Sequence, residues 1–196
     1  MTESDGARIG GLLLAAGGSS RFGRPKQVVE FEGETLIRRA ARALIEAACR
    51  PMLVVLGAEV NASAEEIIDL PVHIRVNADW KTGMSSSIKT GLEGLLAIDP
   101  GLDAVLITLC DQPRIGSGHL TALMAEFGRS RSPIVATEYE DAAGVPTLFS
   151  SEMFGRLLEL RGDKGARVLI RDSPDVKTIR CDAAEFDIDT PDDLLK

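Results

Sequence analysis

Short apolar runs alternate along the chain with longer segments in which apolar residues recur every three or four positions. The runs have the length of buried β-strands, and the first of them covers Ile9 to Ala15. The predicted strands are 9–15, 52–56, 72–76, 104–110, 133–137, 144–149 and 176–180. Residues 137–146 are expected to form a hairpin-like excursion within this series.

The segments between the strands carry helix signals. Apolar residues at helical spacing predict a helix over 35–49 with Thr35 as its N-cap. A second helix is predicted over 63–70, because Ser63 and Glu66 have the spacing of a capping box. Further predicted helices begin at 85–87 and cover 117–127 and 166–171. Strands that alternate with helices predict an α/β fold with three layers, in which helices cover both faces of a mostly parallel sheet.

Composition limits what this fold can bind. The 196 residues, 44% of them hydrophobic, suit one domain over 9–196 that follows a flexible N-terminal tail, 1–8. The formal net charge of −8 argues against nucleic-acid binding, which needs a basic surface. The start of the chain is polar and acidic, no apolar run reaches the ~18 residues of a membrane span, and the three cysteines form no paired motif. These features predict a soluble cytoplasmic protein.

The end of the first predicted strand carries the strongest chemical signal. The stretch LLLAAGGSSRFGRPK, residues 12–26, places a glycine turn, two hydroxyls and two cations directly after an apolar run. Backbone N–H groups of such a turn converge on anions, so the stretch predicts a triphosphate site. The groups that would hold the phosphates are Gly17, Gly18, Ser19, Ser20, Arg21 and Lys26.

Two familiar phosphate motifs are excluded there. Residues 18–23 match G-x-x-x-x-G, but Arg24 and Pro25 follow where a P-loop needs Lys and then Ser or Thr. A G-x-G-x-x-G dinucleotide fingerprint is absent from the stretch. An ordinary glycine-rich connection between a strand and a helix remains the alternative.

Two other junctions follow predicted strands. Gly83 leads into a helix that opens with Ser85, Ser86 and Ser87, and these serines are either capping residues or part of a site. Asp111 ends the strand 104–110, where it either starts a turn before Pro113 or offers a carboxylate at the carboxyl end of the sheet.

The long motif after the first strand resembles the signature L-A-A-G-x-S-x-R-x-G-x-x-K of the MobA-like nucleotidyltransferases, most closely their molybdenum cofactor cytidylyltransferase branch. The matching residues are Leu14, Ala15, Ala16, Gly17, Ser19, Arg21, Gly23 and Lys26. The resemblance implies a Rossmann-like nucleotidyltransferase fold over nearly the whole chain. It also implies that Arg21 and Lys26 act on the triphosphate.

The resemblance assigns expected roles to residues further along the chain. C-D-Q-P is similar to a magnesium-binding motif, which makes Asp111 a catalytic residue and a metal ligand. D-T-P-D-D-L is similar to a closing motif in which Asp189 completes the Mg²⁺ site, with Asp187 as its rival. The expected nucleotide-binding residues near the base are Gly83, Ser85 and Ser86, and the expected acceptor-binding residues are Gly144, Pro146, Lys164 and Arg167.

The implied reaction is transfer of CMP from CTP to molybdenum-loaded molybdopterin with release of pyrophosphate. CTP is favoured over GTP because the family's guanylyltransferases tend to carry Gly where this chain has Ala16. A phosphate monoester is mostly dianionic near neutral pH, since its second pKa is about 6, and it needs no general base. The alternatives are a cytidylyltransferase for a sugar phosphate or methylerythritol phosphate, and a non-catalytic cofactor carrier that contacts a molybdenum hydroxylase.

Overall fold

A seven-stranded sheet forms the centre of the computed structural model, which describes residues 6–19, 22–140, 142–163 and 165–195. The strand order is β5-β4-β1-β6-β8-β7-β9. The strands of this sheet are β1 (Ile9–Ala15), β4 (Met52–Leu56), β5 (His73–Val76), β6 (Ala104–Leu109), β7 (Ile134–Tyr139), β8 (Ala142–Ser150) and β9 (Val176–Arg180). A separate small ribbon pairs β2 (Glu30–Phe31) with β3 (Glu34–Thr35).

The sheet is parallel apart from one strand. β1 pairs in parallel with both β4 and β6, β4 with β5, and β7 with β9. β8 runs antiparallel to its neighbours β6 and β7. The mostly parallel sheet predicted from the sequence is therefore confirmed, and the expected excursion over 137–146 is the β7–β8 hairpin.

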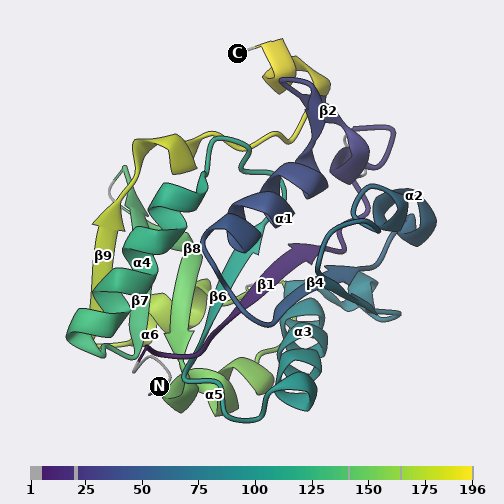
Figure 1. Ribbon diagram of the computed structural model, residues 1–196. Coiled ribbons are helices and arrows are strands. Elements are labelled where there is room, and N and C mark those ends of the chain that lie inside the picture. Colours follow the sequence, from purple (N-terminus) through teal and green to yellow (C-terminus); the bar gives the residue numbers. More distant parts are fainter. Residues whose placement is uncertain (1–5, 20–21, 141, 164, 196) are drawn as a thin grey trace, which may run out of the picture.

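Helices cover both faces of the sheet. The described α-helices are α1 (Leu36–Glu46), α2 (Val60–Glu65), α3 (Met84–Ile98), α4 (Ser117–Ser130), α5 (Phe154–Leu158) and α6 (Arg167–Asp172). Figure 1 shows α1 and α4 in front of the strands, where α1 packs on β1 and β4 and α4 packs on β7 and β8. This face of the sheet includes Leu13. The opposite face, which includes Leu12, packs against α3, α5 and α6. None of the helices formed by the described residues is long and apolar enough to cross a bilayer.

Two helix predictions were wrong at their ends. α1 begins after Thr35 as expected, but the Thr35 hydroxyl donates to Glu66 Oε2 at 3.0 Å and does not cap the helix. α1 also ends at Glu46, before the expected end at 49. The predicted capping box at Ser63 is wrong, because α2 begins at Val60 and Ser63 lies buried inside it.

A small third hydrophobic cluster joins the segment after β1 to the C-terminal segment. It contains Phe22 and Val29 from the segment after β1, Leu36 from α1, and Ile188 near the C-terminus. The Ile188 N–H donates to the Asp111 carbonyl oxygen at 2.9 Å. The acidic C-terminal segment is thereby held beside the end of β6.

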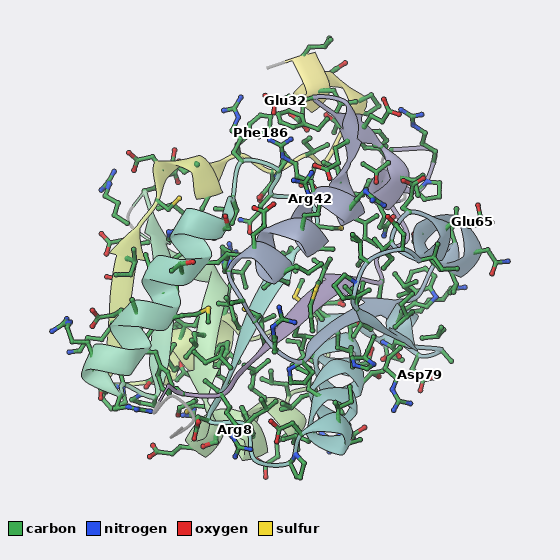
Figure 2. All side chains as sticks on the ribbon, in the orientation of Figure 1. Arg8, Glu32, Arg42, Glu65, Asp79 and Phe186 are labelled. Carbon is green, nitrogen blue, oxygen red and sulfur yellow. The ribbon has the colours of Figure 1, made fainter. Side chains whose placement is uncertain are left out.

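Charged side chains of both signs lie around the outside of the molecule, including Glu32, Arg42 and Glu65 in Figure 2. Several form exposed pairs, such as Arg42 with Glu46 at 3.1 Å. Exposed pairs of this kind contribute little to stability. The charges that matter for chemistry lie instead at the carboxyl edge of the sheet.

Candidate active site

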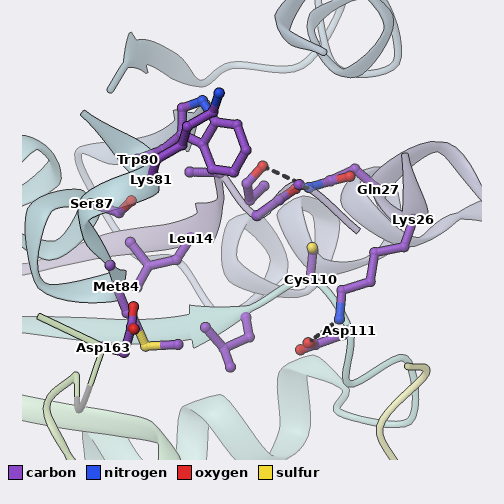
Figure 3. A pocket seen from close by; sticks show the side chains of 16 residues that line it. Leu14, Lys26, Gln27, Trp80, Lys81, Met84, Ser87, Cys110, Asp111 and Asp163 are labelled. Atoms are coloured by element: carbon purple, nitrogen blue, oxygen red, sulfur yellow. Dashed lines mark hydrogen bonds and ion pairs between the residues drawn. The ribbon is translucent and has the colours of Figure 1, made fainter. Parts of the chain in front are cut away.

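A pocket of about 420 Å³ lies at the carboxyl ends of β1 and β6. Its walls come from the loop after β1, the start of α3 and the end of β6. Figure 3 shows Trp80 and Lys81 at one end of the pocket, and Lys26 with Asp111 at the other. The lining residues are Leu14, Ala15, Ala16, Gly17, Gly18, Lys26, Gln27, Trp80, Lys81, Gly83, Met84, Ser87, Leu109, Cys110, Asp111 and Asp163.

Lys26 joins two carboxylates that are far apart in the sequence. Its Nζ donates to Asp111 Oδ2 at 2.7 Å and to Asp189 Oδ1 at 3.1 Å. The Lys26 and Asp111 side chains are largely buried, whereas the Asp189 side chain is half exposed. The structure thus brings together three residues that the sequence analysis placed in one site.

The electrostatics of this group keep Lys26 charged. Burial disfavours the ammonium, but the negative charge of Asp111 and the hydrogen bonds to Asp111 and Asp189 outweigh it, so the pKa of Lys26 lies above its ordinary value. Burial also disfavours the charged form of the neighbouring thiol, and it raises the pKa of Cys110 to about 12. Cys110 is therefore a neutral wall residue, and Lys26 is a cation held beside it.

The carboxylate pair fits a divalent metal ion. Asp111 Oδ1 is buried and has no hydrogen-bond partner within the described part of the chain. A buried carboxylate oxygen left in this way is an open ligand position. The residues described here contain no cluster of three or more His, Cys, Asp or Glu side chains suited to a metal. Two carboxylates completed by substrate phosphates and water are the arrangement that Mg²⁺ prefers.

Gln27, which the sequence analysis did not single out, braces the glycine loop. It is buried, and its Nε2 donates to the carbonyl oxygens of Ala15 at 3.1 Å and Gly17 at 2.7 Å. Ser19 Oγ donates to Gln27 Oε1 at 3.3 Å and accepts the Lys26 N–H at 2.9 Å. Ser19 thus shapes the loop from within. The predicted phosphate ligands Ser20 and Arg21 lie outside the described residues.

The start of α3 forms the opposite wall. Asn77 Nδ2 donates to Ser86 Oγ at 2.8 Å and to Ser87 Oγ at 3.0 Å. Ser87 lines the pocket, whereas Ser86 is bonded to the loop before it and the Ser85 hydroxyl is buried away from the pocket. Gly83 lines the pocket as expected, and its φ of 114° favours glycine. Ser87 is therefore the serine that lines the pocket, whereas Ser85 and Ser86 were the ones expected there.

A second, larger cavity of about 980 Å³ adjoins the first and shares Met84, Leu109 and Asp163 with it. β7, β8, β9 and α6 supply its other walls. Arg167 lines it and donates from Nη2 to the Tyr139 hydroxyl at 2.9 Å. Arg167 is one of the residues that the sequence analysis expected to bind the acceptor.

Three further sequence predictions fall around the larger cavity. Gly144 does not line it; a side chain there would collide with the Tyr139 hydroxyl, so Gly144 leaves room for Tyr139. Pro146 also lies off the cavity, and its carbonyl accepts the Thr137 hydroxyl at 2.6 Å. Lys164 lies outside the described residues.

Asp187, the rival of Asp189, lines the larger cavity. Burial and the nearby charges of Asp111 and Asp189 raise the pKa of Asp187 to about 6. Since Lys26 bonds Asp189 and no bond from Lys26 to Asp187 is described, the geometry pairs Asp189 with Asp111.

A glycine loop, a buried cation and two carboxylates at the carboxyl edge of a mostly parallel sheet define a nucleotide-binding α/β enzyme. Comparison with family models makes this specific: residues 11–178 match the MobA-like NTP transferase domain, and the chain belongs to that family of nucleotidyltransferases. The chain is 30% identical to nicotine blue oxidoreductase of Paenarthrobacter nicotinovorans, over 100% of this chain and 99% of that protein. It is 26% identical to a probable molybdenum cofactor guanylyltransferase of Bacillus mycoides, over 66% of this chain and 62% of that protein.

Solved structures agree with the family assignment. The crystal structure of an Rv0371c homologue from Mycobacterium sp. strain JC1 is 31% identical, with a TM-score of 0.81 over 96% of this chain and 93% of that one. Rv0371c from Mycobacterium tuberculosis, in a complex with manganese, is 26% identical, with a TM-score of 0.77 over 95% of this chain and 96% of that one. Solved structures of nucleotidyltransferases share this Rossmann-like fold as well.

Proposed function

We propose that this protein transfers CMP from CTP to the phosphate of molybdenum-loaded molybdopterin and releases pyrophosphate. The observation that carries the proposal is the bridge from Lys26 Nζ to Asp111 and Asp189 beside the glycine loop, with Asp111 Oδ1 buried and unpartnered in the described chain. Such a site offers a cation for a triphosphate and oxygen ligands for a metal ion.

The residues present have separate tasks in this reaction. An oxygen of the acceptor phosphate bonds to the α-phosphorus of CTP, the bond from that phosphorus to the β-phosphate oxygen breaks, and pyrophosphate carries away the electron pair. Lys26 and Arg21 stabilise the negative charge of the triphosphate and of the leaving pyrophosphate. Asp111 and Asp189 would hold a divalent cation. That cation, Mg²⁺ in this proposal, neutralises phosphate charge when it is bound.

Two observations support the choice of substrates. Ala16 lines the pocket beside Ala15, which is the alanine pair that favours CTP over GTP by resemblance. The larger cavity, about 980 Å³ with Arg167 and Arg171 in its wall, suits a bulky acceptor that carries a phosphate. Molybdopterin is such an acceptor, and delivery of the product to a molybdenum hydroxylase in the cytoplasm is part of the proposal.

The test is pyrophosphate release with CTP, GTP, ATP and UTP in turn, with Mg²⁺ or Mn²⁺ and molybdenum-loaded molybdopterin. We expect turnover with CTP at least about tenfold above the other nucleotides, which corresponds to roughly 1.4 kcal/mol of discrimination. Turnover with GTP alone would keep the enzyme class and overturn the choice of base. Turnover only with a sugar phosphate or methylerythritol phosphate would overturn the acceptor.

A second candidate function is an oxidoreductase, and the observation that favours it is the full-length similarity to nicotine blue oxidoreductase. The G-x-G-x-x-G fingerprint of dinucleotide folds occurs nowhere in the sequence. Oxidation of NADH or NADPH in the presence of an electron acceptor tests this candidate. Turnover there, without pyrophosphate release from any nucleotide, would replace our proposal.

A further inference from the structure

Trp80 lies directly against the phosphate-binding turn. It is the single tryptophan of the chain, half-buried in the short 3₁₀ helix Trp80–Thr82 that leads into α3. A Cβ atom added to Gly18 would come within 2.7 Å of Trp80 Cη2 and 2.8 Å of Cζ3. The indole therefore fills the space that a side chain at position 18 would need.

Glycine is required at position 18 by this contact and not by the backbone conformation there. Gly18 does not have a positive φ, so an L-residue could adopt its conformation. Nearby Gly57, at the end of β4, is constrained differently. A Cβ there would lie 2.7 Å from the Ala16 carbonyl oxygen as well as 2.7 Å from Trp80 Cβ. The indole is thus packed between the turn after β1 and the end of β4.

Trp80 is itself fixed by the wall that carries Ser87. The Asp79 N–H donates to Asn77 Oδ1 at 3.0 Å, and the Asp79 carbonyl accepts the hydroxyls of Thr82 at 2.7 Å and Ser86 at 3.1 Å. These bonds hold the backbone on either side of Trp80. The indole therefore lies between this wall and the glycine turn.

We propose that Trp80 is a positioning residue that sets the place of the phosphate-binding turn, and that position 18 is glycine because the indole packs on it. The inference rests on the proposed function, since it assumes that the turn binds the triphosphate. Trp80 contacts the turn and acts through it on the phosphates. It contributes no group to the reacting atoms.

Calorimetric titrations with CTP and with inorganic tripolyphosphate test the inference. Trp80→Ala should weaken binding of both probes by about tenfold, which is the size of coupling found between contacting residues. Trp80→Phe, which keeps a ring in place, should restore most of that loss. Tripolyphosphate alone should change the fluorescence of Trp80, a signal that a purely structural role would not produce. A loss of CTP affinity without loss of tripolyphosphate affinity would show that the indole stacks on the base, and would overturn the inference.

A double-mutant comparison makes the test sharper. Gly18→Ala should weaken tripolyphosphate binding in the wild-type background and have almost no added effect in the Trp80→Ala background, where the ring is gone. Gly57→Ala should stay harmful in both backgrounds, because the Ala16 carbonyl remains. Gly118→Ala in α4 has open space around it and should change nothing. Effects of Gly18→Ala and Trp80→Ala that simply multiply would overturn the inference.

The two proposals fail in different ways. If the wild-type protein binds neither CTP nor tripolyphosphate, the nucleotidyl transfer proposal falls and this inference falls with it. If the wild type binds both probes but Gly18 and Trp80 are independent, only the positioning role of Trp80 is refuted.

Discussion

The two cavities of the site share a wall but are built differently. The smaller one lies where parallel strands β1 and β6 end, and its polar groups are bonded to one another across the sequence, as Lys26 is to Asp111. The larger one lies against the antiparallel β7–β8 hairpin, and its described Arg167–Tyr139 bond is exposed. Preorganised polar groups favour one ligand geometry, whereas an open wall accepts several. In the proposed reaction, the difference suits a nucleotide held in one geometry in the smaller cavity and an acceptor in the larger one.

The largest effect should follow from Asp111→Asn, because Asp111 lines the smaller cavity and not the larger one. Loss of the carboxylate removes the proposed metal ligand and the partner of Lys26, so kcat should fall by roughly a hundredfold or more. Pyrophosphate release measures it. Asp99→Asn is the matched control, because Asp99 pairs with Arg8 at the amino end of the sheet. Turnover of Asp111→Asn close to that of the control would contradict the proposed mechanism.

The two glutamines of the chain provide the next comparison, one for each cavity. Gln27→Ala leaves the carbonyls of Ala15 and Gly17 without their donor, and should cost about 2 kcal/mol of unfolding free energy. It should also raise KM for the nucleotide. Gln112 donates to the Ala184 carbonyl, is hydrogen-bonded to the Asp187 side chain and lines the larger cavity, so Gln112→Ala should cost a similar amount and raise KM for the acceptor. Urea unfolding and steady-state kinetics measure both. A reversed pattern of KM changes would show that we have assigned the cavities wrongly.

Arg167→Met should raise KM for the acceptor by about tenfold and leave KM for CTP unchanged, because a charge-assisted hydrogen bond to phosphate is lost. Arg42→Met is the control, since Arg42 is exposed on α1 and pairs with Glu34 and Glu46. An equal rise in both KM values would mean that the two cavities are not separate subsites.

The smallest effect should come from Tyr139→Phe. It removes the hydroxyl that accepts from Arg167 but keeps the ring, and an exposed hydrogen bond of this kind orients a side chain more than it stabilises it. KM for the acceptor should rise by about threefold or less. A larger effect than that of Arg167→Met would make the Tyr139 hydroxyl itself a ligand of the acceptor.

Local patterns predicted the strands better than the helix ends. The runs 9–15 and 52–56 match β1 and β4 residue for residue, because a buried and mostly apolar run has clear limits. The prediction of 176–180, where apolar and polar residues are mixed, matches β9 as well. The start of α2 was mispredicted, because the pair Ser63 and Glu66 has capping spacing while Glu59, with a φ of 50°, in fact precedes the helix. The Ser63 side chain is buried inside the helix by tertiary packing, which a local pattern does not contain.

The residues of the candidate site also divide into those that the sequence could predict and those that it could not. Asp111 and Asp189 could be placed together because the resemblance named both and a parallel sheet gathers its carboxyl ends. Gln27 was missed, and Ser87 was named only as one of three serines and not among those expected near the base, since the roles of both depend on contacts with other segments. Gly144 was expected at the acceptor and instead leaves room for Tyr139. Local sequence patterns could not reveal roles that depend on contacts with residues from distant segments.

The bridge made by Lys26 has a consequence for the order in which substrates arrive. Its ammonium offsets part of the negative charge of Asp111 and Asp189 in the free protein, so a lone metal ion must compete with a cation that is already bonded to both. A metal ion that arrives on the nucleotide brings the phosphates that Lys26 needs as new partners. The proposed reaction therefore favours entry of the metal–nucleotide complex as one unit, with the acceptor binding second.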